Sequence, residues 1–224
     1  LIINGKDIIA QAQSGTGKTG AFLIGILGNI KEESSDINKI IIAPTHELAL
    51  QIYEIINELS KYMNIKIELL IGKTKVQDSI QKLSNNPQIV VGTPGRILDM
   101  INRNFLYTSK IDTLILDESD EMLSFGFINT IYNIISLLPK ETQICLFSAT
   151  MPEEILDLST KFLNSPEKLL INKEHLTLEG IKQFYINTIN YNWKYDTILD
   201  LYNKLSINQC IIYINTKHIL DKVY

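Results

Sequence analysis

The chain has 224 residues, of which 45% are apolar and 21% charged, and its formal net charge is −4 at pH 7. This length favours one large domain or one and a half, and the composition fits both enzymes and binding modules. The negative charge argues against nucleic-acid binding through a broad basic surface, so any such contact must be local. No apolar run approaches the length of about 20 residues that crosses a bilayer, and no signal-peptide pattern opens the chain. We therefore expect a cytoplasmic or nuclear protein without membrane contact.

Short apolar runs alternate with segments of helical period from Asp7 to Asn172. This alternation predicts an α/β fold, in which about seven parallel strands are covered by helices. Strands are expected at Asp7–Ala12, Lys39–Ala43, Gln88–Val91, Thr113–Leu116, Gln143–Phe147 and Lys168–Ile171. Apolar residues at helical spacing predict two of the intervening helices, through Leu48, Ile52, Ile55, Ile56 and Leu59 and through Val76, Ile80 and Leu83.

Residues 1–171 are expected to form the first domain, residues 172–180 a polar linker, and residues 181–224 the start of a second domain. The last part predicts a strand, a helix from about Asn192 to Leu205, a strand at Cys210–Ile214 and the beginning of another helix. A piece of this size buries too little surface to be stable alone, so we expect the second domain to be truncated.

A phosphate-binding loop is predicted between the first strand and the helix that follows it. The loop consists of Ala12, Gln13, Ser14, Gly15, Thr16, Gly17, Lys18 and Thr19. Gly15 and Gly17 permit positive φ, so that backbone N–H groups can surround phosphate oxygens. Lys18 supplies a charge for the β and γ phosphates, and Thr19 a hydroxyl for Mg²⁺. Ala12 stands where the strict pattern has a glycine, and the alternative is a glycine-rich turn with a solvated lysine. The order strand, loop, helix favours the phosphate loop.

Carboxylates cluster directly after the apolar run Thr113–Leu116, as Asp117, Glu118 and Asp120. This position is the carboxyl edge of a buried strand, where open α/β sheets bind ligands. Asp117 is expected to hold Mg²⁺, and Glu118 to orient or deprotonate the attacking water. The alternative is an acidic helix start that interacts favourably with the helix dipole.

These two motifs, together with Pro44–Ala49, Thr93–Arg96 and Ser148–Thr150, resemble those of the DEAD-box ATP-dependent RNA helicases in order and spacing over the whole chain. The resemblance implies a RecA-like parallel sheet with helices on both faces, the start of a second RecA-like domain, ATP and Mg²⁺ as cofactors, and RNA as partner. Leu176–Phe184 and Trp193–Thr197 are similar to the eukaryotic translation initiation factor 4A branch. That branch includes relatives in the exon-junction complex and in pre-ribosomal RNA processing, and the choice within it stays open.

The same resemblance implies two sets of site residues. The catalytic set is Lys18, Asp117, Glu118, Asp120, Ser148 and Thr150, in which Asp120 is expected to hydrogen-bond the Ser148–Thr150 motif. Without the resemblance, Ser148 and Thr150 would be an ordinary polar strand end. The RNA-binding set is Pro44, Thr45, His46, Gly72, Thr93, Pro94, Gly95 and Arg96.

Physical chemistry supports RNA binding at two of these segments. Thr45 and Thr93 each follow a strand and precede a helix, so they are natural N-caps, and Pro94 suits the first helical position. Helix N-termini bind anions without net positive charge, which explains how an acidic protein can hold a sugar-phosphate backbone. Such contacts carry no sequence information, so sequence-independent binding is expected. The alternative is a pair of well-capped structural helices.

Three positions depart from the family pattern. Ser119 replaces the usual alanine and can add a hydrogen bond near Mg²⁺. His46 replaces arginine and loses a permanent charge near the expected RNA path. Gly72 is followed by Lys73 where the family has paired glycines.

The resemblance implies an ATP-dependent RNA helicase that couples ATP binding and hydrolysis to local unwinding of RNA, and this is the preferred interpretation. The alternative, which uses the same motifs, is a clamp that ATP locks on RNA as an assembly platform with suppressed hydrolysis. Protein regulators of the initiation-factor or exon-junction type and a monomeric state are expected. In the family, the adenine-recognition segment would precede Leu1, and the arginines that contact the γ-phosphate would follow Tyr224. We therefore expect weak hydrolysis by these residues alone.

Overall fold

The structure is a computed structural model that describes residues 1–13, 15–30, 32–170, 181–190, 192–216 and 218–220. The chain divides into two compact units, with the division between residues 178 and 179. Each unit is described by itself. In the described part of the chain, no helix is both long and apolar enough to span a membrane.

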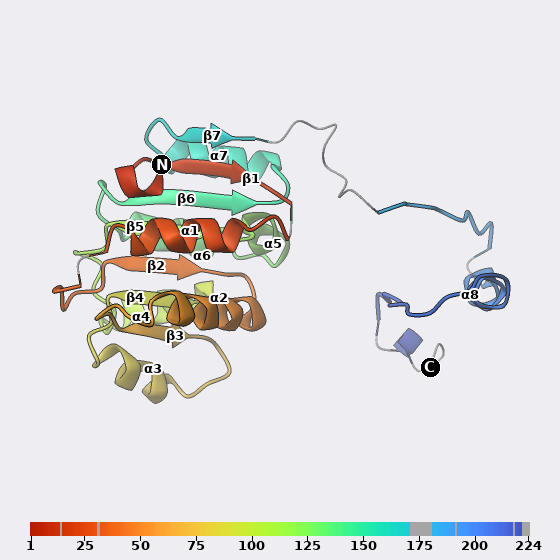
Figure 1. Ribbon diagram of the computed structural model, residues 1–224, viewed down its shortest axis with the longest axis horizontal. Coiled ribbons are helices and arrows are strands. Elements are labelled where there is room, and N and C mark those ends of the chain that lie inside the picture. Colours follow the sequence, from red (N-terminus) through yellow and green to blue (C-terminus); the bar gives the residue numbers. More distant parts are fainter. Residues whose placement is uncertain (14, 31, 171–180, 191, 217, 221–224) are drawn as a thin grey trace. The chain divides into compact units, whose positions relative to one another are not determined.

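The first unit contains a seven-stranded sheet in the order β3-β4-β2-β5-β6-β1-β7, and every pair of neighbouring strands is parallel (Figure 1). The strands are β1 Ile8–Gln11, β2 Lys39–Ile42, β3 Ile67–Leu70, β4 Ile89–Gly92, β5 Thr113–Leu116, β6 Gln143–Ser148 and β7 Glu167–Leu169. The central strands are buried on both faces, which explains their continuous apolar sequences.

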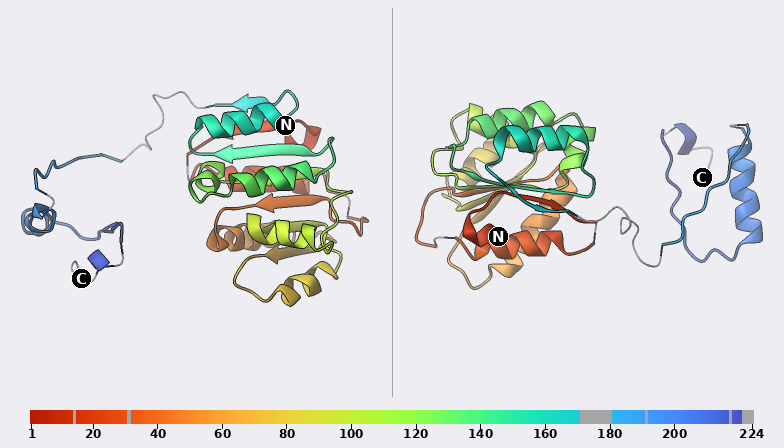
Figure 2. Two further views of the ribbon diagram at one scale, coloured as in Figure 1. Left: turned by 180° about the vertical axis from the view of Figure 1, so that it is seen from behind. Right: turned by 90° about the horizontal axis from the view of Figure 1, so that it is seen from above.

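Helices cover both faces of this sheet (Figure 2). They are η1 Ile2–Asn4, α1 Lys18–Leu27, α2 His46–Leu59, α3 Val76–Leu83, α4 Pro94–Asn102, α5 Ser119–Ser124, α6 Ile128–Ser136 and α7 Glu153–Phe162. One hydrophobic cluster packs η1, α1 and α2 against one face, through residues such as Phe22 and Ile52. A second cluster packs α3 to α7 against the other face, through residues such as Met100 and Ile134.

The register of the sheet brings the carboxyl ends of five strands to one edge. Ile42 at the end of β2 is opposite both Gly92 of β4 and Leu116 of β5. On the other side of β5, Leu116 is opposite Leu146 of β6, and Ser148 at the end of β6 is opposite Gln11 of β1. The loops that follow these strands therefore open at the same edge, which we call the carboxyl edge.

The six strands expected by range in the first unit are confirmed, with bounds that differ from the prediction by at most two residues. The last strand begins at Glu167 and ends at Leu169, and Ile171 lies outside the described residues. The helix expected through Leu48, Ile52, Ile55, Ile56 and Leu59 is α2. Leu59, the last residue of this helix, is exposed.

The second unit contains α8 at Trp193–Lys204, which confirms the expected helix, and residues 218–220 are helical. The strand expected at Cys210–Ile214 is wrong, and residues 181–188 form no strand either. A strand forms only where a neighbour accepts its hydrogen bonds, and the described residues of this unit contain no such neighbour. No residue of α8 is buried within the unit. The predicted linker at 172–180 lies outside the described residues.

Candidate functional site

The phosphate-binding loop follows β1 at the carboxyl edge. Gly15 and Gly17 have φ of 80° and 89°, in the left-handed region that favours glycine. A Cβ added at either residue would meet no atom within 4 Å, so the backbone conformation, not space, requires glycine. Thr16 closes the turn by donating its hydroxyl to the Gln13 carbonyl at 2.8 Å. Ser14 lies outside the described residues.

The N-terminus of α1 is prepared for an anion. No side chain caps it, so the amides of its first turn are not taken up by a capping group. These amides and the helix dipole favour a negatively charged ligand. The loop is also attached to the neighbouring strand, because Ala12 N donates to the Ser148 carbonyl at 3.0 Å.

An ion pair joins the phosphate-binding loop to the acidic strand end. Lys18 Nζ lies 3.2 Å from Glu118 Oε1, and the two side chains are only 7% and 19% exposed. Lys18 follows β1 and Glu118 follows β5, with β6 between these strands. The two motifs that the sequence predicted separately therefore form one site.

Asp117 is the most buried carboxylate of the site, with 2% of its surface exposed. Burial and the adjacent Glu118 carboxylate raise its pKa to about 6, and Lys18 offsets part of this shift. Asp117 Oδ1 accepts a hydrogen bond from Glu118 N at 3.0 Å. Glu118 itself has a φ of 49°, a left-handed conformation that is strained for this residue type and is often found at functional sites.

Asp120 connects the acidic strand end to the end of β6. Its Oδ2 accepts from Thr150 N at 2.9 Å and from the Thr150 hydroxyl at 2.6 Å, and Asp120 N donates to Ser148 Oγ at 3.2 Å. Burial alone would raise the pKa of Asp120, but the hydrogen bonds from Thr150 and Ser148 lower it below its ordinary value. The predicted contact between Asp120 and the Ser148–Thr150 motif is thus present.

Ser119 faces the sheet rather than the metal side of the site. Its buried hydroxyl lies 3.1 Å from the Leu116 carbonyl and 3.2 Å from the Phe147 carbonyl, at the ends of β5 and β6. The hydroxyl therefore adds hydrogen bonds at the ends of β5 and β6, one residue before the carboxylate of Asp117.

The site offers few protein ligands for a metal ion. In the described part of the chain, no group of three or more His, Cys, Asp and Glu side chains gathers as a metal site. Mg²⁺ commonly uses one or two carboxylates together with phosphate oxygens and water, so Asp117 and the Thr19 hydroxyl fit such an ion only alongside a phosphate ligand.

The helices that follow β2 and β4 also begin at the carboxyl edge, but their caps differ. Thr45 Oγ1 accepts from Leu48 N at 3.2 Å, as an N-cap does. Thr93 occupies the N-cap position of α4 without a side-chain capping bond, and Pro94 is the first helical residue. Pro44 is buried, whereas Gly95 is exposed.

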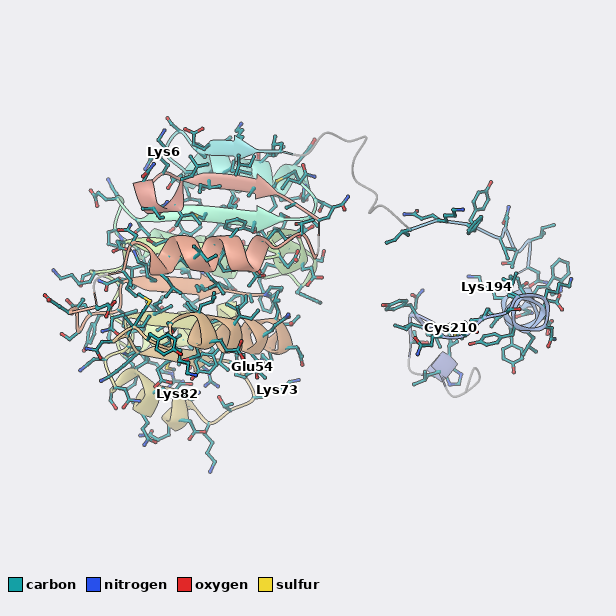
Figure 3. The ribbon with its side chains drawn as sticks, viewed as in Figure 1. Lys6, Glu54, Lys73, Lys82, Lys194 and Cys210 are labelled. Atoms are coloured by element: carbon teal, nitrogen blue, oxygen red, sulfur yellow. The ribbon has the colours of Figure 1, made fainter. Side chains whose placement is uncertain are left out.

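The segment after β3 lies against the start of α2. A Cβ added at Gly72 would come within 3.0 Å of His46 Nε2, so these two predicted RNA-binding residues are neighbours. Lys73 has a φ of 61° and an exposed side chain. In Figure 3 this residue lies on the carboxyl-edge side of the sheet. Glycine is favoured at such a φ, so the departure from the family pattern is conformationally strained.

Arg96 is placed differently from the expectation. Its side chain is buried and donates to Thr74 and Ser79. Neither partner could be recognised in the sequence, since a single threonine in a turn and a single serine in a helix carry no pattern that distinguishes them.

A cavity of about 510 Å³ lies at the opposite edge of the sheet, where the loops lead into β2, β4 and β5. It is lined by Ser35, Asp36, Ile37, Ile80, Leu83, Ser84, Asn86, Asn104, Phe105, Tyr107, Ser109 and Lys110. None of the predicted catalytic residues is among them, so the candidate chemistry lies at the carboxyl edge.

Comparisons with known proteins identify the family of the chain. Residues 1–158 match the DEAD/DEAH box helicase family. The chain is 50% identical over 216 residues to the ATP-dependent RNA helicase eIF4A of Debaryomyces hansenii, which covers 96% of the chain and 54% of that protein. The chain thus spans about half the length of the curated relatives it matches.

Two solved structures show the same architecture. The chain matches S. cerevisiae Dbp5 bound to RNA and ADP BeF3 with a TM-score of 0.83 and 33% identity, over 98% of this chain and 55% of that one. It matches a DEAD box protein from the hyperthermophile Methanococcus jannaschii with a TM-score of 0.74 and 37% identity, over 91% of this chain and 54% of that one. These matches confirm the predicted RecA-like sheet. The family match covers more than half of the residues of this chain, and the chain therefore belongs to the DEAD/DEAH box helicase family.

Proposed function

We propose that the chain is the nucleotide-binding part of an ATP-dependent RNA helicase of the initiation factor 4A type. The observation that carries this proposal is the ion pair between Lys18 and Glu118, with 3.2 Å between Nζ and Oε1. This pair joins a phosphate-binding loop to an acidic strand end in one partly buried site, as triphosphate hydrolysis requires.

Each residue of the site has a role in this proposal. The residues from Ala12 to Thr19 surround the phosphates, while Asp117 and Thr19 would hold Mg²⁺. The ion would supply positive charge to neutralise the charge that develops on the phosphates. Lys18 exchanges its carboxylate partner for a phosphate oxygen, which leaves Glu118 free to orient or deprotonate water. Asp120, through Ser148 and Thr150, couples the nucleotide state to the strand end of β6.

RNA binding is assigned to the other part of the carboxyl edge. The openings of α2 at Pro44–His46 and of α4 at Thr93–Gly95, with the Gly72 backbone between them, offer amides and hydroxyls to a sugar-phosphate backbone. These groups read no bases, so binding is independent of sequence. This explains RNA binding by a chain whose net charge is −4.

The proposal extends to the organisation of the protein. Residues 1–171 form the ATP-binding domain, residues 172–180 a linker, and residues 181–224 the start of a second RecA-like domain. The division of the chain between residues 178 and 179 supports this, as does the exposure of apolar side chains such as Trp193 and Leu199 on α8. We place this monomeric protein in the cytoplasm or nucleus, with regulators of the initiation-factor or exon-junction type.

The test is RNA-stimulated ATP turnover and unwinding of a short RNA duplex by the full-length protein, with Glu118→Gln as the matched variant. We expect RNA to stimulate multiple turnovers of ATP by the wild-type protein. In the variant, the rate of ATP turnover should fall by a factor of about 10² to 10⁴. Since glutamine keeps the shape of the side chain, the variant should still bind nucleotide.

Other outcomes have distinct meanings. Slow release of ATP and RNA with little unwinding would replace the helicase by an RNA clamp that serves as an assembly platform. A protein with neither RNA-dependent ATP turnover nor ATP-dependent RNA binding would have neither activity, and the proposal would be abandoned.

A further inference from the structure

Arg96 joins α4 to a segment that precedes it in the chain by about 20 residues. Its Nη1 donates to Ser79 Oγ at 2.5 Å and to Thr74 Oγ1 at 3.1 Å, and its Nη2 donates to the Thr74 carbonyl at 2.8 Å. Arg96 is only 8% exposed, and Ser79 in α3 is 2% exposed. The guanidinium is thus committed to the protein itself in this structure.

The segment held by Arg96 contains the turn at Gly72 and Lys73. The Thr74 hydroxyl, which accepts from Arg96, also donates to the Ile71 carbonyl at 2.9 Å and so closes this turn. On one side, the turn lies against His46. Just before the turn, the Leu70 carbonyl at the end of β3 accepts from Thr93 N at 3.1 Å. The three segments proposed to bind RNA are therefore neighbours at the carboxyl edge, and Arg96 holds the turn that lies beside His46.

We infer that Arg96 is a positioning residue, which orders the turn at 72–74 and the start of α3 so that the Gly72 backbone lies between the openings of α2 and α4. It does this in place of a direct contact with an RNA phosphate. The inference rests on the proposed function, because it assumes that the carboxyl edge binds RNA.

The chemistry of the side chain explains why arginine occupies this position. A guanidinium presents several N–H groups in a rigid plane, so it can bond a hydroxyl and a carbonyl of one residue and the hydroxyl of another simultaneously. An ammonium group is a single charged centre on a flexible stem and cannot reproduce this arrangement. Lysine would keep the charge and lose the geometry, which makes it a discriminating substitution.

The test measures binding of a labelled single-stranded RNA by the full-length protein, with Mg²⁺ and a non-hydrolysable ATP analogue. The variants are Arg96→Lys, Thr74→Val, Thr74→Ser and Ser79→Ala. We expect Arg96→Lys and Thr74→Val to weaken RNA binding roughly tenfold, and Ser79→Ala several-fold, because each leaves a polar group of the network unpaired. Thr74→Ser retains the hydroxyl and should bind within about twofold of wild type.

Salt dependence separates the two roles of Arg96. Thr74→Val removes no charge, so the slope of log Kd against log salt should equal the wild-type slope although affinity is lower. A direct phosphate contact predicts the reverse, namely wild-type affinity for Thr74→Val and Ser79→Ala, with a shallower slope only when the arginine charge is removed in Arg96→Gln. That reverse pattern would overturn the inference.

Amide hydrogen exchange without RNA provides a second readout. Arg96→Lys and Thr74→Val should exchange residues 72–79 at least about tenfold faster than wild type, and unchanged exchange would overturn the inference. Thr74 is an exposed turn residue, so its variants remain informative if Arg96→Lys fails to fold. If the wild-type protein binds no RNA, the proposed function fails and the role toward RNA fails with it, whereas faster exchange in the variants would still show that Arg96 orders the turn.

Discussion

The two halves of the carboxyl edge are built from different interactions. After β1, β5 and β6, charged side chains bond one another or a hydroxyl across strands, as in the pair Lys18–Glu118 and the contact between Asp120 and Thr150. After β2, β3 and β4, the groups at the edge are helix openings and a turn, and the cation Arg96 is bonded inside the protein. We call these the charged half and the backbone half.

This difference follows from what each half is proposed to bind. A triphosphate with Mg²⁺ concentrates charge at one place, so partly buried charges at fixed positions bind and polarise it. A sugar-phosphate backbone is extended and its charges are evenly spaced, so several helix N-termini can bind it without net positive charge. Substitutions should therefore act through charge in the first half and through geometry in the second.

The largest effect is expected for Lys18→Ala. It removes the cation of the phosphate-binding loop, and we expect nucleotide affinity to fall at least about a hundredfold, measured by titration of a fluorescent ATP analogue. The matched control is Lys6→Ala. Lys6 pairs with Glu167 at 2.8 Å at the opposite edge (Figure 3), where both side chains are about half exposed. An exposed pair contributes little, so the control should bind nucleotide as wild type does. Equal losses in both variants would contradict the assignment of the charged half.

The next effect concerns stability. The pKa of Asp117 is raised from 3.8 to about 6, so the folded chain holds a proton that the unfolded chain has released. The free energy of unfolding therefore falls as pH rises from about 4 to 6, and it stays lower above that range. Without Mg²⁺, Asp117→Asn should be more stable than wild type at pH 7, by about 2 kcal/mol, because it removes a buried charge and keeps the acceptor for Glu118 N. It should also lose Mg²⁺-dependent nucleotide binding.

Urea unfolding with EDTA at pH 4 and at pH 7 measures this prediction. The free energy of unfolding of Asp117→Asn should exceed that of wild type at pH 7. This difference should be largely absent at pH 4, where Asp117 is protonated in the wild-type protein. A variant that is less stable than wild type at pH 7 would show that Asp117 contributes to folding through contacts rather than opposing it through its charge.

The sequence was sufficient to predict the first unit because its signals are local. Continuous apolar runs such as Lys39–Ile42 favour a buried strand, and the loop with Gly15 and Gly17 has a required conformation. In the second unit, the run at 210–214 has the same apolar character without becoming a strand. Strand formation depends on a partner, and sequence pattern alone does not report whether one is present.

Some contacts of the site were predicted from the sequence and others were not, for a similar reason. The contact of Asp120 with Ser148 and Thr150 was expected, because the family motifs place those residues at adjacent strand ends. The orientations of Arg96 and Ser119 were not expected, since each depends on which neighbour accepts a hydrogen bond in three dimensions. Motifs therefore indicated which residues gather at the carboxyl edge, but not which of them face the ligand.

The two caps of the backbone half provide a smaller and more specific comparison. Thr45→Ala removes a capping bond and should lower the free energy of unfolding by about 1 kcal/mol. Thr93→Ala removes no such bond and should change stability by less than about 0.5 kcal/mol. Because the Thr93 hydroxyl is proposed to contact RNA, Thr93→Ala should bind RNA several-fold more weakly although the variant protein is as stable as wild type. Thermal unfolding and RNA titration of both variants make the comparison, and equal destabilisation by the two substitutions would contradict it.

A small effect, on stability alone, is expected for Ser119→Ala, which restores the residue usual in the family. The serine hydroxyl bonds the carbonyl groups that end β5 and β6, so its removal should lower the free energy of unfolding by about 0.5 to 1 kcal/mol. Because the hydroxyl is directed toward the strand ends, RNA-stimulated ATP turnover should stay within about twofold of wild type. A large change in turnover with unchanged stability would mean that Ser119 acts on the ligand, and the boundary of the charged half would then have to include it.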